Sequence, residues 1–110
     1  MSESANINPS VAMKLVDLAE YAERSVVSRT IIDKKVGTVT LFSFDAGQGL
    51  SEHSAPFDAL VCLLDGEVEV VISGNAHLLK EGEMIILPAN EPHALKGTRR
   101  FKMMLIMIRA

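Results

Sequence analysis

The sequence predicts an all-β domain, a sandwich or barrel preceded by a short helix. Short runs of aliphatic and β-branched residues recur about every ten residues, and turn-forming residues separate them. Of the 110 residues 48% are hydrophobic but only 5% are aromatic, so aliphatic side chains must fill most of the core, as suits a β-rich fold. Strands that follow one another through turns indicate a sandwich or barrel and argue against a strand–helix–strand fold.

The chain begins with a polar stretch that includes Pro9, so we expect a flexible leader at 1–12 and a single domain at 13–110. Apolar side chains then fall at helical intervals, at positions 15, 18, 19 and 22. This spacing predicts one or two turns of helix ahead of the strands.

The strands are predicted from the alternation of short apolar runs and turn residues. Asp65-Gly66 is the strongest hairpin signal, because aspartate followed by glycine suits a tight turn between antiparallel strands. Residues 46–49 contain two glycines and are predicted to form a sharp loop. The predicted strands span residues 25–32, 37–45, 58–64, 67–71, 76–80, 84–87, 93–95 and 100–108.

Two predicted strands, 59–64 and 101–108, are apolar on both faces. An antiparallel sheet usually leaves one face in water, so a strand of this kind needs cover on both sides. A second copy of the chain is the simplest cover, and we expect a homodimer. The alternative is that the short helix and the leader cover the outer face.

Composition excludes several classes of partner. The formal net charge is −3, which argues against binding to nucleic acid because that requires a basic face. The longest apolar run, 103–108, is far too short to span a membrane. The single cysteine, Cys62, cannot form an intrachain disulfide, and the N-terminal residues do not resemble a signal peptide. We therefore expect a cytoplasmic protein.

Two short histidine-containing motifs carry the most information. The first runs from Gly47 through His53, and ends at Gly66. The second runs from Gly82 through Pro88 to His93. The glycines permit tight turns, and proline ends a strand cleanly because it has no N–H to donate.

In residue types and spacing the two motifs resemble the signature motifs of the cupin superfamily, and the resemblance covers residues 38–108. It implies the cupin double-stranded β-helix, a jelly-roll barrel that usually holds a metal ion. In that family the first motif supplies two histidines and a glutamate, and the second supplies one histidine.

This chain departs from the family pattern at the centre of the site. Ala55 and Ala59 stand where the resemblance implies the second histidine and the glutamate. Strand parity places positions 53, 55 and 59 toward the barrel interior. The predicted pocket is therefore marked by two imidazoles and small apolar side chains: His53, Ala55, Ala59, Val61 and His93.

Three functions remain open from the sequence. The first is a small-molecule-binding cupin with a reduced or absent metal site, in which His53 and His93 orient the ligand or act as acid and base. The second is a metal-dependent enzyme of dioxygenase, isomerase or decarboxylase type, with Zn, Fe, Mn or Ni on these two histidines. The third is a regulatory or structural dimer without chemistry of its own.

Other residues could complete a metal site, but each has a simpler interpretation. Asp58 and Cys62 have the parity of the opposite face, and Glu52 is expected in a solvated loop. His77 is predicted to be an ordinary, partly exposed strand residue. The remaining candidate ligand is Gln48.

Overall fold

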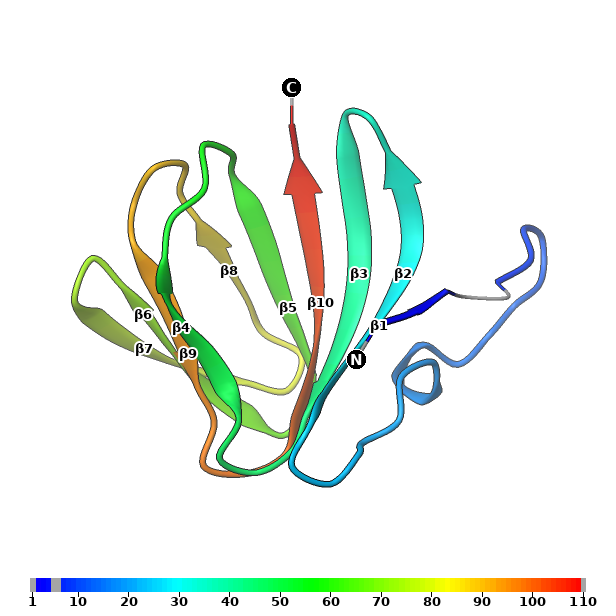
Figure 1. The fold of residues 1–110 in the computed structure, drawn as a ribbon, viewed down its shortest axis with the longest axis horizontal. Helices are drawn as coiled ribbons and strands as arrows, with labels where there is room; N and C mark the ends of the chain where they lie inside the picture. Colours follow the sequence, from blue (N-terminus) through cyan, green and yellow to red (C-terminus); the bar gives the residue numbers. More distant parts are fainter. Residues whose placement is uncertain (1, 5–6, 110) are drawn as a thin grey trace.

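The computed structural model describes residues 2–4 and 7–109, and it consists of two mainly antiparallel sheets packed face to face (Figure 1). One sheet has the strand order β1-β2-β3-β10-β5-β8 and the other has the order β4-β9-β6-β7. The only parallel pair in the described part is β1 with β2. The strands are β1 (Ser2–Ser4), β2 (Val26–Lys34), β3 (Gly37–Phe44), β4 (Gly49–His53), β5 (Ala59–Asp65), β6 (Glu67–Ile72), β7 (Asn75–Lys80), β8 (Met84–Leu87), β9 (His93–Lys96) and β10 (Phe101–Ile108).

The predicted all-β jelly roll is confirmed, and every strand predicted from the sequence is present. Two strands were not predicted, β1 and β4. Figure 1 shows the sheets close together at one end of the barrel and spread apart at the other. The core fills the narrow end, where the buried rings of Phe44 and Phe101 stack with centroids 4.3 Å apart.

The predicted N-terminal helix is shorter than expected. It is a single 3-10 turn, Leu15–Asp17, and its N-cap residue Lys14 makes no side-chain hydrogen bond to the turn. The carbonyl groups of Val16, Leu18 and Ala19 accept hydrogen bonds from side chains of the barrel. Tertiary contacts therefore replace the bonds that would have continued a helix. No helix in the described part of the chain is long and apolar enough to cross a membrane.

Residues 14–25, here called the strap, lie against the outer face of the six-stranded sheet (Figure 1). Three barrel side chains donate hydrogen bonds to strap carbonyl oxygens. Ser43 Oγ donates to Ala19 at 2.6 Å and Arg29 Nη1 donates to Leu18 at 2.8 Å. Lys102 Nζ donates to Val16 at 2.6 Å. The strap covers one end of this face, where Ser43 is fully buried.

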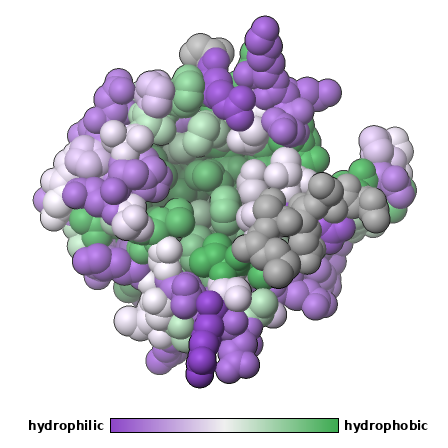
Figure 2. Space-filling model, viewed as in Figure 1, coloured by the Kyte–Doolittle hydropathy of each residue, from purple (hydrophilic) through white to green (hydrophobic). Residues whose placement is uncertain are grey.

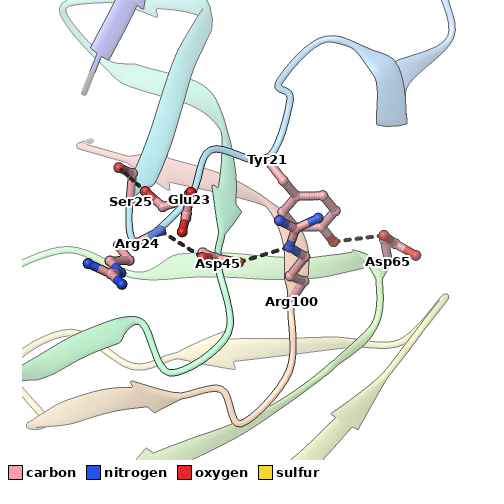
Figure 3. A network of polar contacts seen from close by, with 7 residues as sticks. All are labelled: Tyr21, Glu23, Arg24, Ser25, Asp45, Asp65 and Arg100. Atoms are coloured by element: carbon pink, nitrogen blue, oxygen red, sulfur yellow. Dashed lines mark hydrogen bonds and ion pairs between the residues drawn. The ribbon is translucent and has the colours of Figure 1, made fainter.

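A polar network closes the end of the strap (Figure 3). The Tyr21 hydroxyl donates to Asp65 at 2.7 Å, and the carboxylate of Asp45 accepts hydrogen bonds from Arg100 Nε and from the Arg24 backbone N–H. The bond from Arg100, followed by those from backbone N–H groups, lowers the pKa of Asp45 from 3.8 to about 2. Burial, and then the hydrogen bond to Asp65, raise the pKa of the Tyr21 hydroxyl well above its usual range.

The hairpin predicted at Asp65-Gly66 is wrong, because Gly66 leads the chain from β5 in one sheet to β6 in the other, whereas Gly74 lies in the turn of the β6–β7 hairpin. The two glycines offer a matched test of turn geometry, because both adopt a positive φ, +79° and +82°. A Cβ atom at Gly66 would lie 2.3 Å from the backbone oxygen of Arg100, whereas at Gly74 nothing lies within 4 Å. Gly74→Ala should lower the free energy of unfolding by about 1 kcal/mol, from backbone strain alone. Gly66→Ala should lower it by about 3 kcal/mol, because the backbone must also move. Urea unfolding measures both, and equal losses would contradict this account.

The network of Figure 3 predicts an acid-sensitive contribution to stability. Since the folded-state pKa of Asp45 is depressed, its contribution is complete above the ordinary pKa of 3.8 and is lost as the pH falls through about 2. In urea unfolding at a series of pH values, Asp45→Asn should lose less stability over this range than the native chain does. Arg100→Gln should weaken the same dependence, because Arg100 is the main cause of the shift. If the free energy of unfolding fell with pH as steeply in both variants as in the native chain, Asp45 would not be the source of the acid sensitivity.

Candidate functional site

His53 and His93 come together across the pair formed by β4 and β9, where they are direct register partners. Leu50 pairs with Leu95, and the register shifts before His53 pairs with His93. Between these two pairs the chain advances three residues on β4 but only two on β9. The extra residue on β4 is a β-bulge. Without the extra residue Leu50 and His53 would face opposite ways, because strand side chains alternate. The bulge turns both side chains into the barrel, where both line the same cavity.

The two imidazole rings meet edge to face. Their Nε2 atoms are 3.1 Å apart, and the ring planes are inclined at 72°. Each Nδ1 lies near a backbone carbonyl oxygen two residues earlier in the chain, Ser51 at 2.9 Å for His53 and Glu91 at 3.2 Å for His93. A carbonyl oxygen can only accept, so the Nδ1–H groups must donate.

The histidine pair makes more contacts of hydrogen-bonding length than two neutral rings have N–H groups to donate. The pair has three contacts of hydrogen-bonding length, two to carbonyls and one between Nε2 atoms. Two neutral imidazoles carry one N–H each, and the carbonyl groups take both. Both Nε2 atoms then present lone pairs to the same point. That point favours a hydrogen-bond donor or a cation.

The two histidines differ in their access to water. His93 is buried, with 7% of its surface exposed, whereas His53 is exposed. Burial, and then the proximity of His53, lower the pKa of His93, against a smaller opposing effect of the Glu91 carbonyl. His93 therefore favours the neutral form.

The histidines border a cavity of about 50 Å³ between the two sheets. Figure 2 shows an apolar hollow at the centre of the molecule with hydrophilic residues around it. A water molecule needs about 10–15 Å³ of such space, so the cavity suits a small molecule. The five pocket residues proposed from the sequence, His53, Ala55, Ala59, Val61 and His93, all line it. Sequence reasoning missed the other lining residues, which are Leu50, Phe57, Leu87, Leu95, Met103, Leu105 and Met107.

Three of the lining residues that sequence reasoning missed could have been found from the sequence. Residues 103, 105 and 107 share one face of a strand that was predicted to be apolar on both sides, and a barrel requires one face to look inward. Leu50 was not recognisable, because it lies on the strand with the bulge. Phe57 lies in the loop before β5, where no periodic pattern exists.

The other candidate ligands lie elsewhere. None of Gln48, Glu52, Asp58 and Cys62 lines the cavity in the described structure. Asp58 lies on the outer side, where its Oδ1 accepts a hydrogen bond from the Ala89 N–H at 2.8 Å. Among residues 2–4 and 7–109, no group of three His, Cys, Asp or Glu side chains could hold a metal ion. His77 is exposed on β7, away from the cavity.

The structural residues of the two motifs form turns. Gly47, Gly66 and Gly82 all have positive φ, and Pro88 directly follows β8. Asn90 also has a positive φ, 67°, a conformation that asparagine tolerates better than most residues. Its backbone N–H donates to the carbonyl oxygen of Ala55 at 2.7 Å. This bond joins the loops of the two motifs beside the cavity.

Comparison with known families agrees with the fold and the motif positions. Residues 40–109 match the family described as the cupin domain. The chain belongs to the cupin family.

Solved structures of other cupins and of uncharacterised proteins superpose closely on this one. A protein of unknown function from Streptococcus pyogenes, SPY1581, shares 33% identity at a TM-score of 0.90, over 100% of this chain and 96% of that one. A cupin superfamily protein from Desulfitobacterium hafniense shares 28% identity at a TM-score of 0.90, over 96% and 97% of the two chains. A cupin 2 conserved barrel protein from Leptotrichia buccalis shares 41% identity at a TM-score of 0.84, over 87% of this cupin but only 47% of its own length. No curated protein matches the chain.

The geometry of the histidine pair makes a prediction about ionisation. NMR titration should give His93 a pKa below 6.5, and the contribution of its neutral form to stability should be lost as the pH falls below 6.5. His53→Ala should raise the pKa of His93, because it removes the electrostatic effect of the neighbouring ring, the second cause of the lowered pKa. The ring signals of His77 should not move in this variant. A pKa of His93 that does not respond to the substitution would contradict the coupling.

Proposed function

We propose that this cupin binds a small, mostly apolar molecule inside the barrel, and that His53 and His93 orient it by accepting a hydrogen bond. The observation that carries the proposal is the pair of Nε2 atoms 3.1 Å apart, with each Nδ1 beside a backbone carbonyl oxygen. From this arrangement we infer that the protons lie on the Nδ1 atoms and that both Nε2 atoms are acceptors. A hydroxyl or N–H group on the ligand donates its hydrogen to this acceptor pair, and the aliphatic wall contacts the rest of the molecule.

The proposal defines the chemical class of ligand. The pocket wall offers aliphatic, thioether and aromatic surface, so it favours compact apolar molecules. The acceptor pair selects those with one O–H or N–H group, such as a phenol, an alcohol or an amide. The same pair can take the proton of an acidic O–H group, because imidazole titrates near neutral pH. A base-assisted reaction is thus within reach of the site.

The second candidate is a metal-dependent enzyme, and one observation favours it. Backbone carbonyls hold both Nδ1 atoms, the arrangement that typically orients a metal-binding histidine. Metal–nitrogen bonds of about 2.0–2.1 Å are compatible with both Nε2 atoms on one ion. The residues present nonetheless supply two donors, whereas protein metal sites use three or four. Methyl groups occupy positions 55 and 59, so this chain's side chains do not form a complete set of metal ligands.

The leading proposal is tested with phenol and toluene, which have the same shape and differ in a hydroxyl group. In NMR titrations the native chain should bind phenol at least tenfold more tightly than toluene, because only phenol donates to the histidine pair. A His53→Ala/His93→Ala double variant should lose this preference, and His77→Ala should retain it. Equal affinities for the two probes in the native chain would refute an acceptor site.

Elemental analysis of untagged protein separates the two candidates. The reduced-site proposal expects Zn, Fe, Mn and Ni well below one equivalent per chain. Near-stoichiometric metal that disappears in the double variant would overturn that proposal and support the enzyme with a metal centre.

A further inference from the structure

The cavity between the sheets has a buried floor and a mouth that solvent reaches. Six of its lining residues are buried and form the floor: Ala59, Val61, Leu87, His93, Leu95 and Met103. The other six are partly or fully exposed and form the mouth: Leu50, His53, Ala55, Phe57, Leu105 and Met107. A ligand that enters the barrel passes between the mouth residues, so their side chains decide which molecules bind.

Phe57 and Met107 lie near each other on one wall of the mouth. Met107 pairs with Ala59 in the register between β10 and β5. The Ile108 N–H donates to the Asp58 carbonyl oxygen at 3.3 Å, which continues this ladder by one residue. Phe57 precedes Ala59 by two residues and lines the same cavity, so it lies diagonal to Met107. Aromatic and other long side chains reach each other across such a diagonal.

The histidine pair belongs to the opposite wall. His53 and His93 lie on β4 and β9 of the four-stranded sheet, whereas Met107 lies on β10 of the six-stranded sheet and Phe57 leads into β5. The cavity is therefore bounded by hydrogen-bond acceptors on one sheet and by a phenyl ring and a thioether on the other. A ligand that donates to the imidazoles presents the rest of its body to Phe57 and Met107.

The ring of Phe57 is not engaged by another ring. Among the described residues the other three phenylalanines stack, Phe42 on Phe44 and Phe44 on Phe101, but Phe57 makes no ring contact. Aromatic rings attract each other through offset or edge-to-face contacts, and a methionine sulfur interacts favourably with a ring edge. An aliphatic ligand of the same size gains neither interaction, so this wall favours an aromatic ligand.

We propose that the ligand class of this cupin is a small phenol, whose ring contacts Phe57 and Met107 while its hydroxyl donates to the histidine pair. The proposal rests on the function proposed above and adds the aromatic ring as a second feature that the site recognises. A phenolic hydroxyl is more acidic than an aliphatic one, so it is also the stronger donor to imidazole. Phe57 and Met107 are then the residues that determine specificity for the ring.

The test compares phenol with cyclohexanol, which has the same number of carbon atoms and the same hydroxyl group but no aromatic ring. In NMR titrations the native chain should bind phenol at least about tenfold more tightly. Phe57→Leu/Met107→Leu keeps an apolar mouth but removes both contacts with the ring, and it should lower this preference at least about fivefold.

The matched control is Phe42→Leu/Met104→Leu, which makes the same two changes at half-buried residues outside the cavity. This control should keep the native preference for phenol. Circular dichroism checks that each variant is folded, and the single variants Phe57→Leu and Met107→Leu replace the double variant if it unfolds.

The position of the ring has a separate NMR signature. Because the π-electrons of an aromatic ring shift the resonances of nearby protons, phenol should move the Met107 methyl signal and cyclohexanol should leave it in place. The methyl signal of Met104, which does not line the cavity, should respond to neither probe.

The outcomes separate this inference from the function on which it rests. Equal affinities for phenol and cyclohexanol, both above that for toluene, would overturn the selection of the ring and leave the acceptor pair supported. Equal affinities for phenol and toluene, both above that for cyclohexanol, would overturn the acceptor pair and support the ring contact. A native-like preference in Phe57→Leu/Met107→Leu, with no movement of the Met107 methyl signal, would overturn the assignment of these two residues.

Discussion

Strands β5 and β10 lie side by side in the larger sheet, and both of their faces are apolar. Because strand side chains alternate, each of these strands contributes to two surfaces at once. Inside the barrel, Val61 and Met103 are fully buried and line the cavity. On the outside, Lys102 binds the strap while Leu60 and Ile106 line an outer groove. The barrel core, the strap and the candidate site all depend on the register between these two strands.

The cavity shows how a small change in side chains alters the chemistry of an unchanged backbone. Ala55 and Ala59 leave space at positions where the family pattern has ligands, and that space joins an aliphatic wall. The two remaining histidines are still held by backbone carbonyls in a fixed orientation. A pair of oriented acceptors in an apolar cavity is costly to leave unsatisfied, and this cost is the physical basis of the selectivity we propose.

The inner and outer surfaces are connected through a single layer of backbone. Ala59 faces the cavity and its neighbour Leu60 faces the outer groove. Met107 and Ile108 have the same relation at the end of β10. Side-chain packing on the outer face of β5 and β10 therefore constrains the backbone that also forms the cavity wall. The strap leaves this end of the sheet free, and the polar network of Figure 3 lies at the opposite end.

Much of this protein followed from the sequence alone, because the decisive signals were local. Gly66 and Gly82 marked turns that need a positive φ, and strand parity within the first motif predicted that Ala59 faces inward. Only the tertiary structure decided the rest. Strand β4 was not predicted because its bulge interrupts the alternation of apolar and polar residues that identifies a strand. The same bulge turns His53 toward His93. The helix predicted from the spacing at 15–22 does not continue beyond one turn, because backbone carbonyl groups there accept hydrogen bonds from Arg29, Ser43 and Lys102 instead. These three residues are distant in sequence. The balance of protons between the two imidazoles depends on carbonyl groups placed by that fold, and no pattern of residue types encodes it.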